Sequence, residues 1–314
     1  MEPPLWAWIA LIAGLFVFAA IDMLVFARGQ HEVRIRTAAL WSLVWVTLGL
    51  SFAIVLGLTQ GGQAAGEYVS GYLIEWSLSI DNLFVFAVIF TYFAVPKEVQ
   101  PRVLLFGVLG ALVFRGIFIA IGAVALGAAH WVIYIFGAFL VFTAYRLARS
   151  GGEQVDPSRN KLLLLVRRYV PSTERYHGNQ VFVREKGRRL ATPVFAVLLV
   201  VASTDLIFAI DSIPAIFAVT DEAFLVLAAN CFALMGLRAA YFVIIGALGR
   251  FEYLHYGLAV VLGVVGLKML TSEIYEPPIW MTLGSVVVIL GVSILASLWA
   301  TRKREPEPAD PVAG

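Results

Sequence analysis

Two acidic segments interrupt the apolar runs of the sequence, and they are the first candidates for chemistry. The segment EWSLSIDN, residues 75–82, carries Glu75 and Asp81, and STDLIFAIDSIP, residues 203–214, carries Asp205 and Asp211. In both, the two acids are six residues apart and the residues between them are apolar or small. Carboxylates, amides, hydroxyls and carbonyls are hard oxygen ligands, which suit Mg²⁺, Ca²⁺ or Mn²⁺ better than Zn²⁺ or Cu⁺. The pattern therefore indicates a site for a hard divalent cation.

The surroundings of these acids make a purely lipid-facing position untenable. On insertion scales, four carboxylates and the two central arginines, Arg115 and Arg238, would together cost about 15 kcal/mol if all of them faced lipid. They are therefore expected to face the bundle interior, to pair with one another or to line water. Asp22, late in the first apolar run, is a fifth acid near membrane depth. If Arg115 and Arg238 serve as buried counter-ions for two acids, two or three carboxylates still need a proton or a bound cation.

The spacing of six residues limits how one helix could present both acids. On a regular helix such residues stand about 120° apart and about 9 Å along the axis. Either each acid meets a partner from another helix, or the helices are broken. Pro214 cannot donate to the carbonyl of Ile210, which predicts a break in the second segment and offers that carbonyl as a further ligand. Asn82 and Ser212 each follow an Asp directly and occupy matching positions.

The composition identifies the elements that must carry these residues. The chain has 314 residues, of which 61% are hydrophobic and 14% charged, whereas a soluble domain would be about half apolar and about a quarter charged. The excess lies in runs of about 20 residues without the alternation of a membrane β-barrel. We therefore predict an all-α membrane protein with about nine transmembrane helices. They are expected at 5–27, 38–58, 70–93, 102–126, 130–148, 192–219, 223–248, 253–271 and 277–300.

The distribution of charge predicts the orientation. Twenty of the 23 Lys and Arg residues fall on alternate connections and in the C-terminal tail, while the opposite connections carry only acids such as Glu67, Asp221 and Glu273. Because positive residues stay on the cytoplasmic side, the N-terminus is predicted outside and the C-terminus in the cytoplasm. The N-terminus lacks the basic start and cleavage site of a signal peptide, so the first apolar run is treated as a retained helix.

The two acidic segments belong to a predicted internal repeat. In each copy an acidic span precedes a span with one central arginine and a Gly-Ala pair. The spans run in opposite directions, so the copies are inverted, which is a common transporter plan. The predicted units are two N-terminal helices in 1–69, the first three-helix repeat in 70–148, a basic cytoplasmic segment in 149–191, the second repeat in 192–271, the last helix in 272–300 and a disordered cytoplasmic tail in 301–314.

The basic segment is the one sizeable part expected outside the membrane. Residues 156–171 are predicted to form a short amphipathic basic helix, and residues 180–192 a hairpin that turns at Lys186-Gly187. The helix could lie on the anionic inner leaflet or be part of a solvated connector; both readings remain open.

The sequence gives little support for the catalytic or nucleotide-binding chemistry of soluble enzymes. No Walker loop, Gly-rich dinucleotide turn or nucleophile elbow is present, so we expect no enzyme activity, no cofactor and no nucleic-acid partner. Cys231 is interpreted as a small buried hydrophobic residue. The histidines, each interpreted as a loop or interfacial residue, are His31, His130, His177 and His255.

The motifs also resemble a known family. GYLIEWSLSIDNLFVFAVIF and STDLIFAIDSIPAIFAVT resemble the two signature segments of the TerC family of bacterial integral membrane proteins, and DMLVFARGQHEVRIRTAALWS and RYHGNQVFVREKGRRLATP are similar to further family segments. The resemblance covers nearly the whole chain, and the repeat plan is similar to that of lysine-exporter-like proteins. The resemblance to the TerC family implies that the protein lies in a bacterial inner membrane and that its cation is Mn²⁺.

The resemblance also implies the residues of the metal site. Matching the family's segments to this sequence implies a metal-binding role for Asp22, Glu75, Asp81, Asn82, Asp205 and Asp211. Backbone or hydroxyl groups expected to support it belong to Thr204, Ile210 and Ser212. Many relatives have an acid where this chain has Ala202, so coordination or coupling can differ here.

The leading hypothesis is a secondary transporter that exports a divalent cation, Mn²⁺ by the resemblance, in exchange for protons. Outward movement of a divalent cation against 100 mV costs about 4.6 kcal/mol, which exchange for two protons would remove. One alternative is a non-transport scaffold or accessory protein in metal or tellurite stress, whose acids are structural. Another is an exporter of Ca²⁺ or an organic cation. The expected partners are the metal ion and the lipid bilayer, and a homo-oligomer is a further possible assembly.

Overall fold

The structure is a computed structural model and describes residues 3–27, 35–129, 131–150, 170–173, 175–185, 187–245, 253–274 and 277–304. Within these ranges, the side chains of residues 18–19, 22–27, 81, 84, 150, 185, 211 and 302–304 lie outside the description. The predicted helix at 156–171 lies almost entirely outside the described residues, and so does most of the predicted tail.

Long helices dominate the part of the chain that the structure describes. They are α1 (Leu5–Ala27), α2 (Ile35–Gln60), α3 (Gly62–Tyr92), α4 (Gln100–Ala128), α5 (Val132–Ser150), α7 (Pro193–Phe217), α8 (Ala223–Ile244), α9 (Leu254–Leu270) and α10 (Ile279–Arg304). Each predicted range overlaps one of these helices, and the largest difference is the start of α3, at Gly62 instead of residue 70. Seven are long and apolar enough to cross a membrane, whereas α9 and the Leu5–Val17 part of α1 are shorter. The all-α prediction is confirmed, and nine crossings remain a prediction.

Local sequence sets several helix ends. Pro101 and Pro193 stand in the first turns of α4 and α7, where a missing N–H leaves no helical bond unmade. Gly61 alone separates α2 from α3 and has a φ of 94°, a conformation that a residue without Cβ adopts without strain. The predicted break at Pro214 is wrong, because α7 continues through this residue to Phe217. A proline removes one hydrogen bond, and the remaining turns and the surrounding helices keep the segment helical.

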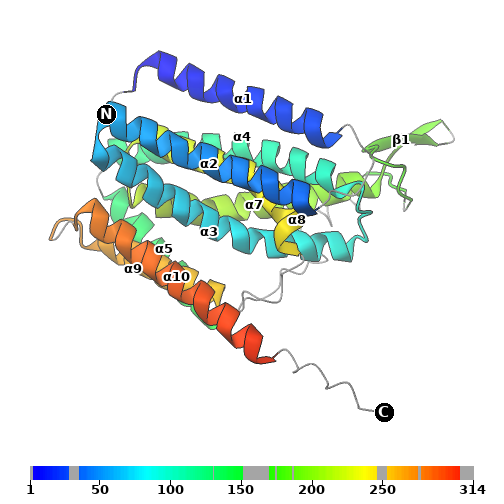
Figure 1. The fold of residues 1–314 in the computed structure, drawn as a ribbon. Coiled ribbons are helices and arrows are strands. Elements are labelled where there is room, and N and C mark those ends of the chain that lie inside the picture. Colours follow the sequence, from blue (N-terminus) through cyan, green and yellow to red (C-terminus); the bar gives the residue numbers. More distant parts are fainter. Residues whose placement is uncertain are drawn as a thin grey trace, which may run out of the picture.

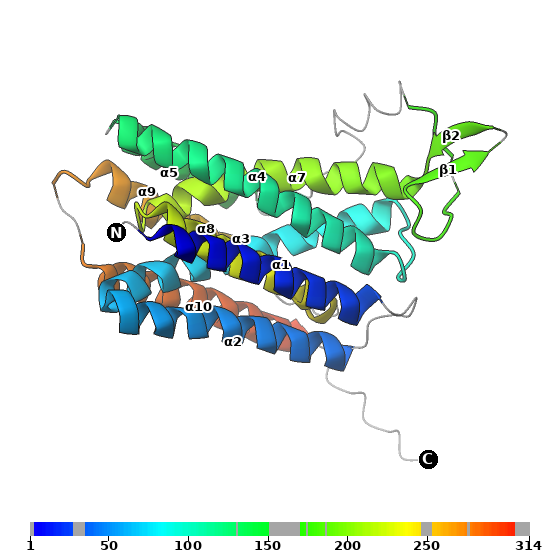
Figure 2. The same cartoon turned by 90° about the horizontal axis from the view of Figure 1, so that it is seen from above.

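The helices pack as a bundle with α8 at its centre (Figures 1 and 2). Helix α8 is buried along most of its length and packs against α2, α3 and α4. Helix α7 packs on α4 and α3, α5 packs along α9, and α10 covers α9 and α3. Helix α1 lies along one side of the bundle with few contacts to α4 and α8.

Helices α5 and α9 are in close contact at two glycines. A Cβ on Gly137 would meet the carbonyl oxygen of Gly266 at 3.0 Å, and a Cβ on Gly266 would meet the carbonyl oxygen of Gly137 at 2.9 Å. Small residues allow membrane helices to pack backbone against backbone. The contact is reciprocal, so the two helices meet on equivalent faces.

The predicted hairpin is confirmed. Strand β1 (Phe182–Glu185) pairs antiparallel with β2 (Arg188–Ala191), and Gly187 in the turn has a φ of 77°. The hairpin projects from one end of the bundle, beside the start of α7 (Figures 1 and 2). Thr192 ties it to that helix by donating its hydroxyl to the carbonyl of Gln180 at 2.6 Å. Tyr176 ties the preceding segment to the end of α3, because its hydroxyl donates to the carbonyl of Phe93 at 2.8 Å.

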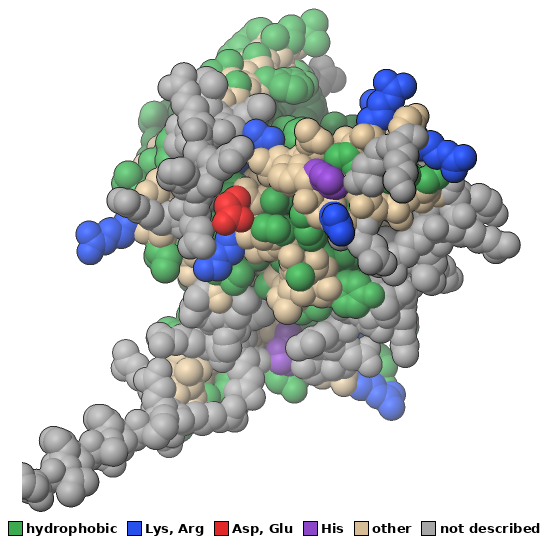
Figure 3. Space-filling model, turned by 90° about the vertical axis from the view of Figure 1, so that its right-hand side faces the viewer, with side chains coloured by type: hydrophobic (Ala, Val, Ile, Leu, Met, Phe, Trp, Pro, Cys, Tyr) green, Lys and Arg blue, Asp and Glu red, His purple; other side chains and the backbone are tan. Residues whose placement is uncertain are grey.

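Basic side chains gather at this same end of the molecule, which faces the viewer in Figure 3. The described residues there come from the start of α2, the connection between α3 and α4, the end of α5 and the hairpin. They include Arg36, Lys97, Arg102, Arg149, Arg184, Arg188 and Arg189. The opposite end carries Glu67, Asp221, Glu222 and Glu273 in its helix starts and connections.

Candidate ion-binding site

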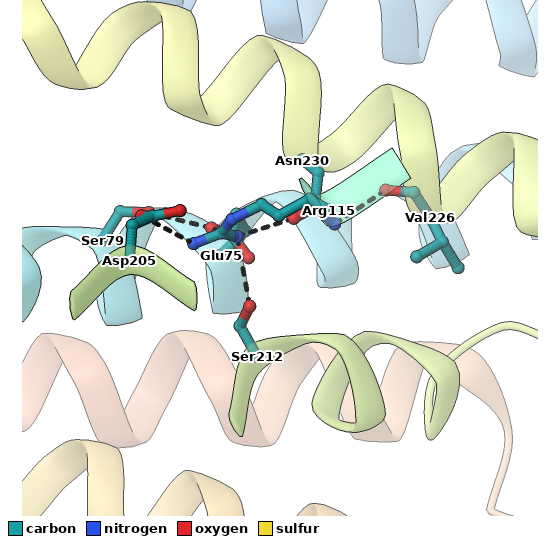
Figure 4. Close-up of polar contacts among 7 residues, drawn as sticks. All are labelled: Glu75, Ser79, Arg115, Asp205, Ser212, Val226 and Asn230. Atoms are coloured by element: carbon teal, nitrogen blue, oxygen red, sulfur yellow. Dashed lines mark hydrogen bonds and ion pairs between the residues drawn. The ribbon is translucent and has the colours of Figure 1, made fainter. Parts of the chain in front are cut away.

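A buried arginine forms the centre of the candidate site. Arg115, in the middle of α4, has an exposed fraction of 0%. Its Nη1 donates to Oε1 of Glu75 on α3, to Oδ1 of Asn230 on α8 at 2.7 Å and to Oγ of Ser212 on α7 at 3.1 Å. Its Nη2 lies 3.7 Å from Oδ1 of Asp205 on α7. Figure 4 shows side chains from all four helices converging on this guanidinium.

The two carboxylates are as deeply buried as the arginine. Glu75 is 0% exposed and Asp205 is 2% exposed. Ser79 donates its hydroxyl to Oε1 of Glu75 at 2.9 Å, so this oxygen receives two donors. The other oxygens, Oε2 of Glu75 and Oδ2 of Asp205, have no hydrogen-bond partner within the described structure. If both carboxylates are ionised, the single guanidinium compensates only one of their two negative charges, and each carboxylate has one oxygen without a partner among the described residues.

Helix geometry explains why these residues meet. Glu75, Ser79 and Asn82 follow spacings of four and three residues, which place them on one face of α3. Asp205 and Ser212 are two turns apart on α7 and share a face in the same way. All five side chains are buried. The two polar faces are opposed across the bundle, so each segment presents its first acid to Arg115.

The residues proposed from the sequence fall into three groups. Glu75, Asp205 and Ser212 come together at Arg115, as just described. Asn82 and Thr204 are buried but form no hydrogen bond to that cluster within the described residues, and Arg238 is buried in α8. The side chain of Ile210 is 45% exposed. Its carbonyl receives no helical hydrogen bond from Pro214 although the helix is unbroken, so its role as a ligand stays a prediction.

The remaining acids are not placed by the structure. The side chains of Asp22, Asp81 and Asp211 lie outside the description. Among the described residues, no group of three or more His, Cys, Asp or Glu side chains is arranged to hold a metal ion. The metal role of the acids therefore stays a prediction, and the observed partner of Glu75 and Asp205 is a guanidinium.

Sequence reasoning missed Asn230 and Ser79. Asn230 is 0% exposed, and its Nδ2 donates to the carbonyl of Val226 at 2.9 Å, which orients Oδ1 towards Arg115. The available signal was an amide in the apolar run of α8, because a polar side chain at membrane depth usually has a polar partner. The signal for Ser79 was its position one turn after Glu75.

Comparison with known proteins identifies the family of this bundle. The sequence model described as "Integral membrane protein TerC family" matches residues 60–305. The chain belongs to the TerC family. The resemblance of its two acidic segments to the TerC signature is thereby confirmed, and the chain is a multi-pass integral membrane protein.

Several TerC relatives are similar over nearly the whole chain. The protein named "Uncharacterized membrane protein STKORF319" of Myxococcus xanthus is 42% identical, with 98% of this chain and 96% of the relative covered. The "Putative membrane-bound redox modulator Alx" of Escherichia coli strain K12 is 41% identical, with 97% of each covered. The "Uncharacterized membrane protein Mb2742" of Mycobacterium bovis is 37% identical, with 94% of this chain and 79% of the relative covered. No solved structure matches.

Proposed function

We propose that this TerC protein is a secondary transporter that exports a divalent metal cation, with Mn²⁺ as the cation that the family resemblance implies. The observation that carries the proposal is the buried cluster of Glu75, Asp205 and Arg115. Two carboxylates from different helices face one guanidinium, and each has an oxygen without a partner in the described structure. A buried negative site of hard oxygen atoms favours a hard cation.

The proposed transport unit is a pair of inverted repeats, residues 70–148 and 192–271, in a chain that crosses the membrane nine times. The packing supports an approximate two-fold relation: α3 packs on α8 as α4 packs on α7, and α5 packs on α9 through the reciprocal contact of Gly137 and Gly266. Transporters of this plan bind their substrate at the interface of the repeats. The cluster lies at this interface, because Glu75 belongs to one unit and Asp205 to the other.

The proposed orientation places the basic end of the bundle in the cytoplasm of a bacterial cell and the N-terminus outside. It rests on the gathering of Lys and Arg at that end, since such residues resist translocation. Export of a divalent cation against 100 mV costs about 4.6 kcal/mol. Exchange for two protons would remove this electrical cost, so we propose proton exchange as the coupling.

The test is cation uptake into inverted membrane vesicles with an imposed pH gradient, measured separately for Mn²⁺, Ca²⁺ and Mg²⁺. Asp205→Asn leaves the pair of Glu75 and Arg115 without net charge, so it should keep the fold and lower uptake at least about tenfold. Glu98→Gln, which removes an exposed carboxylate from the connection between α3 and α4, should leave uptake unchanged. Absence of uptake of all three cations by the wild type, or equal uptake by Asp205→Asn, would refute the proposal.

The name of the Escherichia coli relative raises redox chemistry as a second function. A dithiol couple needs two cysteines, whereas this chain has a single cysteine, Cys231, which is 3% exposed in α8. The chain therefore lacks an internal dithiol, and we propose no dithiol chemistry for it. A scaffold role remains the alternative if the uptake assay fails.

A further inference from the structure

We infer that Arg115 is a tethered counter-cation, which the transported metal ion displaces from Glu75 and Asp205 in each cycle. The inference rests on the proposed function and adds the reason why an arginine stands in the candidate site. The starting point is that the guanidinium contacts both carboxylates, one from each proposed repeat. It therefore occupies the position between the acids that a bridging cation would take.

Arg115 and a metal ion cannot share the two carboxylates without strong repulsion. An arginine stays protonated in proteins, so it cannot escape this repulsion by losing a proton. The site is shielded from water, since Glu75 and Arg115 are 0% exposed and Asp205 is 2% exposed, and burial strengthens the repulsion between like charges. Occupation by metal and occupation by the guanidinium are therefore competing states of the same acid pair.

The structure also provides a place for the displaced guanidinium. Asn230 and Ser212 accept hydrogen bonds from Nη1 of Arg115 at 2.7 Å and 3.1 Å, and both are neutral. Asn230 is held in position by the carbonyl of Val226. Within the described structure, Nε and Nη2 of Arg115 have no hydrogen-bond partner, so the side chain is anchored at one nitrogen. A small rotation about that anchor would release Asp205 first. The hydrogen bonds to Asn230 and Ser212 would then hold the charge when the metal ion takes the place of Nη1 at Glu75.

Competition of this kind would serve the return of the empty transporter. Without metal, two buried carboxylates would oppose any movement through a region of low dielectric constant. Arg115 places a positive charge beside the carboxylates for that step, and its guanidinium moves away from them when metal arrives. The inference therefore separates two processes: net transport needs the empty protein to return, whereas exchange of metal for metal does not.

The experiment uses the full chain in lipid nanodiscs and proteoliposomes. Mn²⁺ binding is measured from the electron paramagnetic resonance signal of the free ion, and net uptake is compared with exchange into vesicles preloaded with Mn²⁺. Arg115→Gln removes the competing charge, so it should bind Mn²⁺ at least about tenfold more tightly than the wild type. Its net uptake should fall about tenfold or more, while exchange stays within about twofold. Arg102→Gln, an exposed position at the start of the same helix, is the matched control and should change neither.

Arg115→Lys covers the case in which the glutamine variant does not fold. Lysine keeps the charge but lacks the fork of donors that binds both acids, so Mn²⁺ should bind about threefold more tightly or better. If Arg115 only holds the helices together, both variants should bind Mn²⁺ equally or more weakly, and net uptake and exchange should change in parallel; this result overturns the inference. A wild type that binds no divalent cation would instead overturn the proposed function.

Discussion

Neutralising Arg115 alone should destabilise the protein far more than neutralising the whole cluster. At the observed 3.7 Å between Arg115 and Asp205, the attraction is about 4–5 kcal/mol for an effective dielectric constant of about 20. Removing one partner of a buried ion pair typically costs about 3–5 kcal/mol, because a charge is left uncompensated. Arg115→Gln leaves two such carboxylates, Glu75 and Asp205, so we expect a loss at the upper end of this range.

The triple variant Glu75→Gln, Arg115→Gln and Asp205→Asn removes all three charges. The two acid-to-amide changes keep the side-chain volume, and the change at Arg115 shortens the side chain. Replacement of a complete buried ion pair or triad by well-packed hydrophobic residues is often neutral for stability. The amides of this variant carry no charge and can bond one another, so it should lie within about 1.5 kcal/mol of the wild type. The assay is reversible unfolding by SDS in mixed micelles, followed by circular dichroism, with Arg102→Gln as a control expected within about 0.5 kcal/mol. A triple variant as unstable as the single one would show that Arg115 stabilises by its shape and hydrogen bonds, and the electrostatic reasoning would be refuted.

Three further predictions concern packing and accessibility. Gly137→Ala should destabilise by about 1–3 kcal/mol in the same SDS assay because its Cβ would press on α9, whereas Gly291→Ala, with nothing within 4 Å, should be neutral or slightly stabilising. Tyr176→Phe should lower the free energy of unfolding by about 0.5–1.5 kcal/mol, because it removes the hydrogen bond to the end of α3. Burial raises the pKa of Tyr176 from 10.0 to about 12. The stability difference between wild type and variant should therefore be constant below pH 10 and disappear as the pH rises through about 12. Cys231, 3% exposed, should react with a maleimide about tenfold or more slowly in the native protein than in SDS, and equal rates would contradict its burial.

The helices were predictable because their signals are local. Apolar runs of about 20 residues define membrane helices, and the turn at Gly187 between alternating segments defines the hairpin. The predicted start of α3, residue 70, is too late. The segment from Gly62 to Val69 includes Glu67 and two glycines, a composition typical of a connection between helices. Backbone hydrogen bonds let the helix extend beyond the apolar run, and there Glu67 accepts hydrogen bonds from Gln63 at 3.0 Å and Thr220 at 2.7 Å.

The meeting of Glu75 with Asp205 was only partly predictable. Their spacing to Asp81 and Asp211 indicated partners on another helix, and the proposed repeat indicated which helix. The choice of Arg115 as the cation for both acids depends on how α4 is rotated about its axis. Rotation is fixed by packing against α7 and α8, including the approach of Gly107 to Val201, and such packing does not follow from one sequence. The same dependence hid Asn230, whose role exists only once α8 lies beside α4.

The contacts of Arg115 divide unequally between the two proposed repeats. Glu75 lies in the same unit as Arg115, whereas Asp205, Ser212 and Asn230 lie in the other. A rocking motion of one unit against the other would therefore act on the contacts that cross the interface before it acts on the pair of Glu75 and Arg115. The contact with Asp205 is the longest of these, at 3.7 Å, and it is not a hydrogen bond in the described structure. Asp205 should thus be the first carboxylate released from the guanidinium, and therefore the first that becomes free to bind a cation.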